Sequence, residues 1–289
     1  MDLKSIGMGL AFAFMWSSAF TSARIIVASA PPIMTLSFRF LISGLIALAV
    51  ARMLGQSFKL SKAQWRATIV FGLCQNAIYL GANFVAMETI EASLAAIIAS
   101  TMPLLVALGS WVFLKEKIGM LGSLGLVAGM IGVMIIMGTR IDSGADPYGM
   151  MLCGMGAVAL ALATMLVRGA TSGGNLLVVV GLQMLVGCVI LAVLGLATET
   201  YAVEWNTSLV LAFIYTTIVP GLAATWVWFL LVNRIGAIRA ATYHFLNPFF
   251  GVAVAAILLG ERVGVLDFVG VAIIMAGILA VQISRSAQT

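Results

Sequence analysis

The only histidine of the chain, His244, lies in an apolar stretch long enough to span a membrane and has polar neighbours at helical spacing. Asn247 is about one turn away from both His244 and Tyr243, so these side chains come together on one side of a helix. Pro248 has no backbone N–H, and in a helix it would free the carbonyl of His244 as a further acceptor. Ionisable groups in membrane helices usually mark a substrate or proton path. We therefore predict that Tyr243, His244 and Asn247 bind substrate. Proton carriage by His244, or a neutral histidine bonded to its neighbours, are the alternatives.

A second polar face lies between residues 75 and 83. Asn76, Tyr79 and Asn83 follow the spacing i, i+3, i+7, so they share one face of a helix, with Gln75 beside them. Unpaired amides are costly in lipid, so this face should turn inward. It predicts either a substrate cavity or hydrogen bonds between helices, which average under about 1 kcal/mol per pair in membranes.

Aromatic and basic side chains within the apolar stretches supply two further kinds of contact. Trp16 and Trp228 lie away from the stretch ends, where their rings could stack on a flat substrate. Arg39 is the one basic residue well inside a stretch, and its guanidinium could bind a substrate carboxylate. It also begins close to one end, from which its side chain could reach the interface.

Several kinds of chemistry lack the residues they need. With one histidine and no aspartate or glutamate in the middle of any apolar stretch, the acid–base pairs of an enzyme are missing. Cys74, Cys153 and Cys188 are too scattered for a metal cluster. We expect no enzyme, no metal and no cofactor. The missing central carboxylate also argues against a proton or sodium engine and against a permanently cationic substrate, so a neutral or zwitterionic solute fits better.

Composition identifies the elements that must position these residues. Of 289 residues, 63% are hydrophobic and 9% are charged, whereas an average soluble domain carries about 25% charged residues. Apolar runs of about 20 residues recur throughout, and lipid favours helices for them. The prediction is an all-α polytopic membrane protein with ten transmembrane helices. Their expected bounds are Ser5–Val27, Ile33–Leu54, Ala67–Met87, Ala92–Leu114, Ile118–Gly138, Tyr148–Val167, Leu176–Ala197, Ser208–Val232, Ile238–Leu259 and Gly264–Ser284.

The lysines and arginines fall unequally on the two sides of these spans. Eleven of the 15 lie on one side: Lys4, Arg52, Lys59, Lys62, Arg66, Lys115, Lys117, Arg168, Arg234, Arg239 and Arg285. The other side holds Arg24, Arg140 and Arg262. The positive-inside rule places the richer side, and with it both termini, in the cytoplasm. This asymmetry explains the net charge of +5 without nucleic acid.

The chain repeats itself at an offset of 145 residues. Residues 90–137 and 235–282 share 12 identities in 48 gapless positions, and Pro103 aligns with Pro248. We expect two five-helix repeats, residues 1–143 and 144–289, and an odd number of spans makes the second copy inverted. The two prolines are predicted hinges, and Ser100 and Thr101 before Pro103 are predicted substrate contacts. Inverted repeats are common in secondary transporters.

The repeated stretches also end on a matched pair of glutamates. Glu116 aligns with Glu261, and both stand beside basic residues at the ends of their spans. We expect solvated or locally paired carboxylates there, with a role in gating as the alternative.

Together with this architecture, three short motifs carry a family resemblance. WSSAF lies in the first span, FRF in the second, and LKEK or LGER ends the repeated stretches. The chain resembles the EamA-type families of the drug/metabolite transporter superfamily, and within it is most similar to bacterial aromatic amino acid exporters of the YddG type. The resemblance implies amino acid export across the bacterial inner membrane through a central basket-shaped cavity. The superfamily has a similar arginine at the position of Arg39, which implies a structural pairing.

The predicted function is therefore a facilitator or exporter of small amphiphilic metabolites, with aromatic or hydrophobic amino acids favoured, that works by alternating access. Other solutes, such as nucleosides, sugar conjugates or cationic drugs, are the close alternative, and a membrane scaffold subunit is a more distant one. The expected partners are a small-molecule substrate and the lipid bilayer, without nucleic acid. The oligomeric state is left open, a monomer included.

Overall fold

The computed structural model describes residues 2–166 and 174–286, and all its regular elements are helical. Ten spans are long and apolar enough to cross a membrane, which confirms the predicted number. The first five consist of α1 (Leu3–Val27), α2 (Pro32–Met53), α3 (Lys62–Phe71) with η1 (Gly72–Leu80) and α4 (Gly81–Ala86), α5 (Ala92–Ala99) with α6 (Met102–Leu114), and α7 (Met120–Asp142). The second five consist of α8 (Pro147–Leu166), α9 (Leu176–Thr198), α10 (Thr207–Ile218) with η2 (Val219–Ala223) and α11 (Ala224–Ile235), α12 (Ala237–Thr242) with η3 (Tyr243–Leu246) and α13 (Asn247–Leu259), and α14 (Val265–Ser286).

The largest shift of a boundary is at the third span, which begins at Lys62 rather than at Ala67. A capping box starts it: Ser61 Oγ accepts from the backbone N–H of Gln64 at 3.2 Å, and Gln64 Oε1 accepts from the N–H of Ser61 at 2.9 Å. The predicted end of the sixth span, Val167, and the basic residue Arg168 lie outside the described residues.

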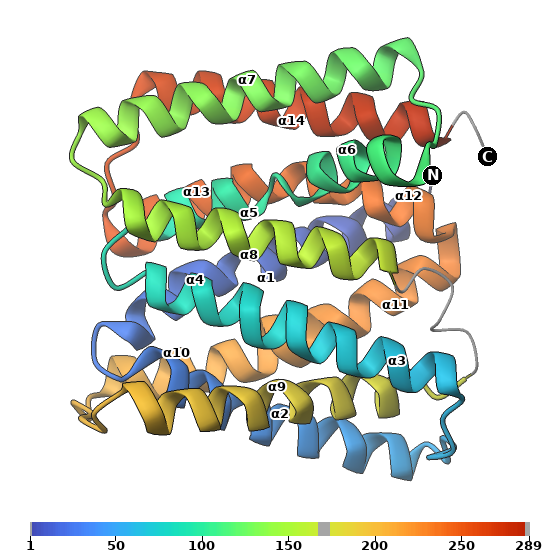
Figure 1. Cartoon of the computed structure of the whole chain (residues 1–289), viewed down its shortest axis with the longest axis vertical. Helices are drawn as coiled ribbons and strands as arrows, with labels where there is room; N and C mark the ends of the chain where they lie inside the picture. Colours follow the sequence, from blue (N-terminus) through green and yellow to red (C-terminus); the bar gives the residue numbers. More distant parts are fainter. Residues whose placement is uncertain (1, 167–173, 287–289) are drawn as a thin grey trace.

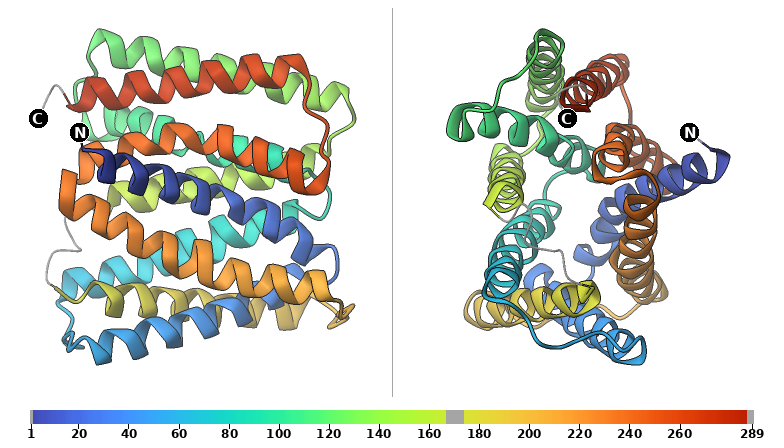
Figure 2. Two further views of the ribbon diagram at one scale, coloured as in Figure 1. Left: turned by 180° about the vertical axis from the view of Figure 1, so that it is seen from behind. Right: turned by 90° about the vertical axis from the view of Figure 1, so that its right-hand side faces the viewer.

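The two halves pack by pairing equivalent helices. At one end of the long axis α7 lies beside α14, and at the other α2 lies beside α9 (Figure 1). Near the middle, α5 packs against α13. Each pair joins a helix of the first half to its counterpart in the second, as an inverted duplication requires. The right-hand view of Figure 2 shows the pairs from the end at which the N and C marks lie.

Glycines allow the same close approach in both outer pairs. A Cβ on Gly125 of α7 would lie 2.8 Å from the carbonyl oxygen of Gly277 on α14. A Cβ on Gly44 of α2 would lie 3.0 Å from the carbonyl oxygen of Gly181 on α9. Small residues let membrane helices approach to backbone contact. These four glycines therefore hold the ends of the long axis together.

Side chains from one half also cap helices of the other. Glu261 accepts from the backbone N–H groups of Ala92 (2.8 Å) and Ser93 (3.0 Å), which begin α5. Glu199 accepts in the same way from Ile33 and Met34, both at 2.8 Å, at the start of α2. The first turn of a helix has unpaired N–H groups that favour a carboxylate. The expectation of a solvated or locally paired Glu261 is therefore wrong, because its partners lie 168 and 169 residues away.

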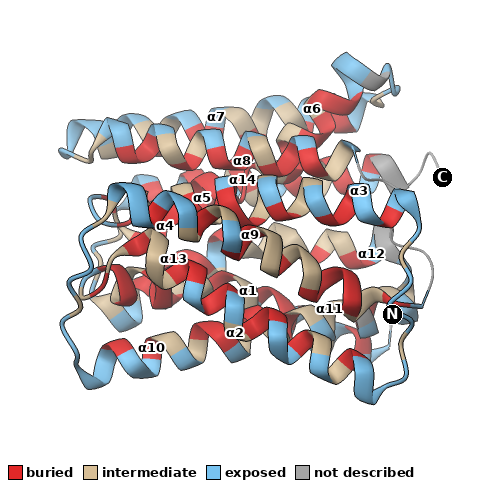
Figure 3. Ribbon diagram, turned by 60° about the horizontal axis from the view of Figure 1, so that its bottom comes forward, coloured by how far each residue is buried: buried red, intermediate tan, exposed pale blue. Residues whose placement is uncertain are grey.

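α1 begins and α14 ends at one end of the bundle, here called the terminal end; the opposite one is the far end (Figure 1). Which of them faces the cytoplasm stays a prediction. Exposed residues lie mostly on the outward faces of the peripheral helices (Figure 3), and many are large and apolar, as lipid requires. In contrast, every residue of α5 is buried.

Candidate functional site

A cavity lies between the two halves, from the middle of the bundle toward the far end. Its empty volume is about 540 Å³, opening included. Its walls come from the second half of α1, the first half of α2, the η1–α4 segment and the junction of α10 with η2. The lining residues are Trp16, Ala19, Phe20, Ala23, Arg39, Gln75, Tyr79, Leu80, Asn83, Phe84, Met87, Thr216 and Pro220.

Two π-helical segments contribute to the wall of this cavity, at equivalent positions of the repeat. η1 contributes Gln75 and Tyr79, and η2 contributes Pro220. Pro220 has no N–H, so the carbonyl of Thr216 loses its normal partner four residues on, and the wider π-helical turn offers the next N–H instead. η1 contains no proline. π-helical turns occur often at functional sites, and here both supply the wall.

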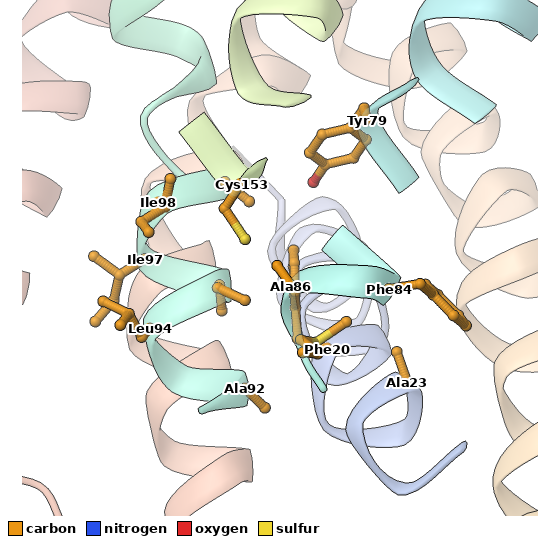
Figure 4. Packing of buried hydrophobic residues seen from close by; sticks show 14 of the residues in the cluster. Phe20, Ala23, Tyr79, Phe84, Ala86, Ala92, Leu94, Ile97, Ile98 and Cys153 are labelled. Carbon is orange, nitrogen blue, oxygen red and sulfur yellow. The ribbon is translucent and has the colours of Figure 1, made fainter. Parts of the chain in front are cut away.

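Tyr79 and Asn83 lie in the cavity wall, and their contact with a substrate stays a prediction. Tyr79 is 4% exposed, and its carbonyl accepts from Nδ2 of Asn83 at 2.7 Å. The Sγ–H of Cys153 on α8 donates to Oδ1 of Asn83 at 3.3 Å, which fixes the amide from the other half. Figure 4 shows Tyr79 and Cys153 with Phe20 and Phe84 in this part of the bundle.

An aromatic cluster, consisting of Phe12, Trp16, Trp228 and His244, adjoins the cavity through Trp16. The ring centroids of Phe12 and Trp228 are 4.8 Å apart, and that of His244 is 5.2 Å from Phe12 and 5.1 Å from Trp228. Trp16 lies 6.5 Å from His244 and also lines the cavity. These are ordinary distances for packed aromatic pairs. Because Trp16 belongs to both, the cluster borders the cavity on the side of the terminal end.

Tyr243 and Asn247 lie beside this cluster: Tyr243 packs in a group of residues that also contacts Trp228, and Asn247 bonds to His244. Tyr243 is buried against Leu231 and Ala240. Only a glycine at position 9 leaves room for its ring, because a Cβ there would lie 2.2 Å from Tyr243 Cε1. Nδ2 of Asn247 lies 3.0 Å from Nδ1 of His244.

The backbone before Pro248 differs from the prediction. The carbonyl of His244 is not free, because it accepts from the N–H of Asn247 at the end of the 3-10 turn η3. Pro248 then stands in the first turn of α13, where its missing N–H costs nothing. Pro103 has the same place in α6. The 3-10 turn η3 therefore pairs the carbonyl of His244, which we predicted to be a free acceptor.

Four predicted contacts, Trp228, Tyr243, His244 and Asn247, lie at the aromatic cluster and not in the cavity lining, and three more lie outside both. Asn76 is 1% exposed, and its Nδ2 donates to the carbonyl of Gln183 on α9 at 2.8 Å, which fits the helix-to-helix alternative. Ser100 and Thr101 donate to carbonyls of their own span, those of Ala96 (2.6 Å) and Ile98 (2.7 Å). In this conformation none of the three is available to a ligand.

Sequence reasoning missed several residues of the cavity wall. Phe20 and Ala23 follow Trp16 at i+4 and i+7 on α1, a spacing that could have predicted them. No local signal marks Phe84 or Thr216, since the packing of α4 and α10 against α1 brings them in.

Residues 3–138 and residues 147–283 each match the model of the EamA-like transporter family, and each range holds five spans. The chain belongs to the EamA-like transporter family. This EamA transporter is 27% identical over 276 residues to the uncharacterized transporter YvbV of Bacillus subtilis, with 95% of this chain and 90% of the relative covered. It is 24% identical over 290 residues to the uncharacterized inner membrane transporter YedA of Escherichia coli, with 98% and 92% covered.

A solved crystal structure matches the fold of the EamA transporter over its whole length. The TM-score is 0.70 at 18% identity, and the match covers 100% of both chains. The family match, rather than this likeness of fold, makes the protein a multi-pass membrane transporter and not an enzyme. The closer likeness to aromatic amino acid exporters and the boundary at residues 143/144 stay predictions.

Proposed function

We propose that this EamA transporter exports small amphiphilic metabolites, above all aromatic or hydrophobic amino acids, across the plasma membrane by alternating access. The observation that supports this most strongly is the composition of the cavity between the halves. Trp16, Phe20, Tyr79 and Phe84 give it flat apolar faces, and Asn83 gives it a fixed amide. Ligand pockets in general combine a mostly apolar lining with a few placed polar groups.

The aromatic cluster supplies the second part of the proposal. It closes the terminal half in this conformation, while the cavity extends toward the far end. An inverted repeat can reach a second state in which the halves exchange roles and the cavity faces the other side. We propose that the spans containing Pro103 and Pro248 rock at their interrupted turns. With the basic-rich terminal end in the cytoplasm, the present state faces outward.

Counterflow in liposomes tests the substrate class. Purified protein is reconstituted, the vesicles are loaded with unlabelled phenylalanine, and labelled phenylalanine is supplied outside. We expect uptake well above that of empty vesicles and at least about tenfold slower uptake by Asn83→Ala. Ser143→Ala is the control, because its exposed hydroxyl lies outside the cavity lining and bonds to the carbonyl of Thr139 one turn earlier.

Two results would contradict the proposal at different levels. If no amino acid exceeds empty vesicles but a nucleoside, sugar conjugate or cationic drug does, then the substrate class is wrong. If Asn83→Ala and Ser143→Ala behave alike with phenylalanine, then the cavity is not the site.

A further inference from the structure

Arg39 is a buried cation without a hydrogen-bonding partner among the described residues. It is 6% exposed and lines the cavity, and its Nε has no hydrogen bond. Within residues 2–166 and 174–286, no carboxylate or carbonyl pairs with its guanidinium; the described contact is the ring of the adjacent Phe40, 5.3 Å from Cζ. The structural pairing implied by the family resemblance is therefore not seen.

Two other arginines of the bundle that are not fully exposed have the hydrogen-bonding partners that Arg39 lacks among the described residues. Arg140 binds both oxygens of Asp267, at 3.2 and 3.0 Å, and also Glu91. Arg24 donates to the carbonyl of Met87. Both lie near the far end, where water also has access. Arg39, which lies deeper, has the greatest need of a partner and has none.

Gly221 of η2 lies close to the guanidinium of Arg39 and to Ser43. A Cβ on Gly221 would lie 3.1 Å from the carbonyl oxygen of Thr216, 3.4 Å from Nη2 of Arg39 and 3.7 Å from Oγ of Ser43. Ser43 is one turn along α2, and its hydroxyl is buried without a hydrogen bond. Two unsatisfied groups, a guanidinium and a hydroxyl, therefore converge on one point. A guanidinium fork matches the two oxygens of a carboxylate, and a hydroxyl can donate to either.

We infer that Arg39, with Ser43, binds the carboxylate of the transported solute. The inference rests on the proposed function and specifies it, because the apolar part of the solute then lies against Trp16, Phe20 and Tyr79. None of the residues that line the cavity is an aspartate or glutamate. The lining therefore offers a charged partner to the carboxylate and none to an α-amino group. Aryl-substituted carboxylic acids should bind like the amino acid, and the matching amine should not.

Three matched probes test this without requiring transport. Binding of phenylalanine, 3-phenylpropionate and phenethylamine to purified protein is measured by calorimetry, on the wild type, Arg39→Gln and Arg39→Lys. Arg66→Gln is the control, since it removes the same charge from an exposed position. We expect phenylalanine and 3-phenylpropionate to bind about equally. Phenethylamine should bind at least about tenfold more weakly, which is the scale of a lost charge-assisted pair.

The variants should separate charge from fork geometry. Arg39→Gln should weaken both acids by at least about tenfold, and Arg39→Lys should weaken them less, while Arg66→Gln leaves them unchanged. If a folded Arg39→Gln binds the acids normally, then the inference is wrong. Should that variant fail to fold, the wild-type ranking still decides: equal binding of phenethylamine and phenylalanine would overturn the inference. In that case phenylalanine counterflow can persist, so only the Arg39 assignment fails; binding of none of the probes, with no counterflow, removes the proposed substrate class as well.

Discussion

The fourth and ninth spans are interrupted at equivalent positions but carry different side chains there. Both are interrupted just before a proline, between α5 and α6 in one copy and at η3 in the other. In the fourth span the interruption carries Ser100 and Thr101, whose hydroxyls are satisfied by their own helix. In the ninth it carries His244, packed among aromatic rings. The interrupted turn thus belongs to the duplicated fold, and the side chains decide which half of the space is closed.

The largest loss of stability should come from removing a ring of the aromatic cluster. Phe12 is 1% exposed and contacts Trp16, Trp228 and His244. Phe12→Ala should lower the free energy of unfolding by about 3–5 kcal/mol, because a buried phenylalanine leaves a cavity. Denaturant or thermal unfolding in detergent measures it. Phe14→Ala is the control, since Phe14 is 44% exposed on the same helix, and equal losses in both variants would contradict the closed cluster.

The next largest loss of stability should come from a side chain that forces the fourth and ninth spans apart. A Cβ on Gly251 of α13 would lie 2.5 Å from the Cβ of Ala96 on α5. Gly251→Val should cost about 1–3 kcal/mol through overpacking. Gly154→Val is a matched helical control, because its Cβ would have no neighbour within 4 Å. If both melt alike, then α5 and α13 do not cross as closely as described.

A smaller difference should distinguish the polar groups of the two spans. Asn247→Ala leaves Nδ1 of His244 without its described partner, and an unsatisfied buried group costs about 1–3 kcal/mol. Thr101→Val loses one bond within its own span and should cost about 0.5 kcal/mol. Paired unfolding curves compare them. Asn247→Ala should lose more stability than Thr101→Val. A larger loss in Thr101→Val would contradict the view that the ninth span carries the more important polar contacts.

The smallest effect lies at the far end, where Thr89 of the first half meets Asp146 of the second. The hydroxyl of Thr89 donates to Asp146 at 2.7 Å and, with backbone N–H groups, lowers the pKa of that carboxyl. A lowered pKa stabilises the fold above the ordinary aspartate value, about 3.9, and the benefit is lost as pH falls through the folded value. Thr89→Val should therefore move the acid loss of stability to slightly higher pH. A melting series against pH, with Thr198→Val as the exposed control, would show an unchanged acid limb if the bond is immaterial.

The sequence predicted the spans and the repeat well, because composition and spacing are local quantities. It predicted the face of Asn76, Tyr79 and Asn83 only in part. The spacing assumed an α-helix, whereas η1 has the wider π-helical turn, so Asn76 falls out of phase and turns toward α9.

Long-range contacts account for what the sequence could not provide. Glu261 caps a helix 168 residues away, and no local pattern indicates that bond. The isolation of Arg39 is likewise a property of its neighbours in space. For His244, the sequence identified the residue and not its surroundings, which are aromatic rings and one amide.

A reversible cross-link across the aromatic cluster tests alternating access most directly. Cysteines replace Phe12 and Trp228, whose ring centroids are 4.8 Å apart, in a protein whose Cys74 and Cys188 are changed to alanine and whose Cys153 is changed to serine, which keeps a donor to Asn83. A short, reducible bifunctional thiol reagent then joins them. We predict that cross-linked protein still binds phenylalanine but gives no counterflow, and that reduction restores the counterflow. Undiminished counterflow by fully cross-linked protein would contradict the account.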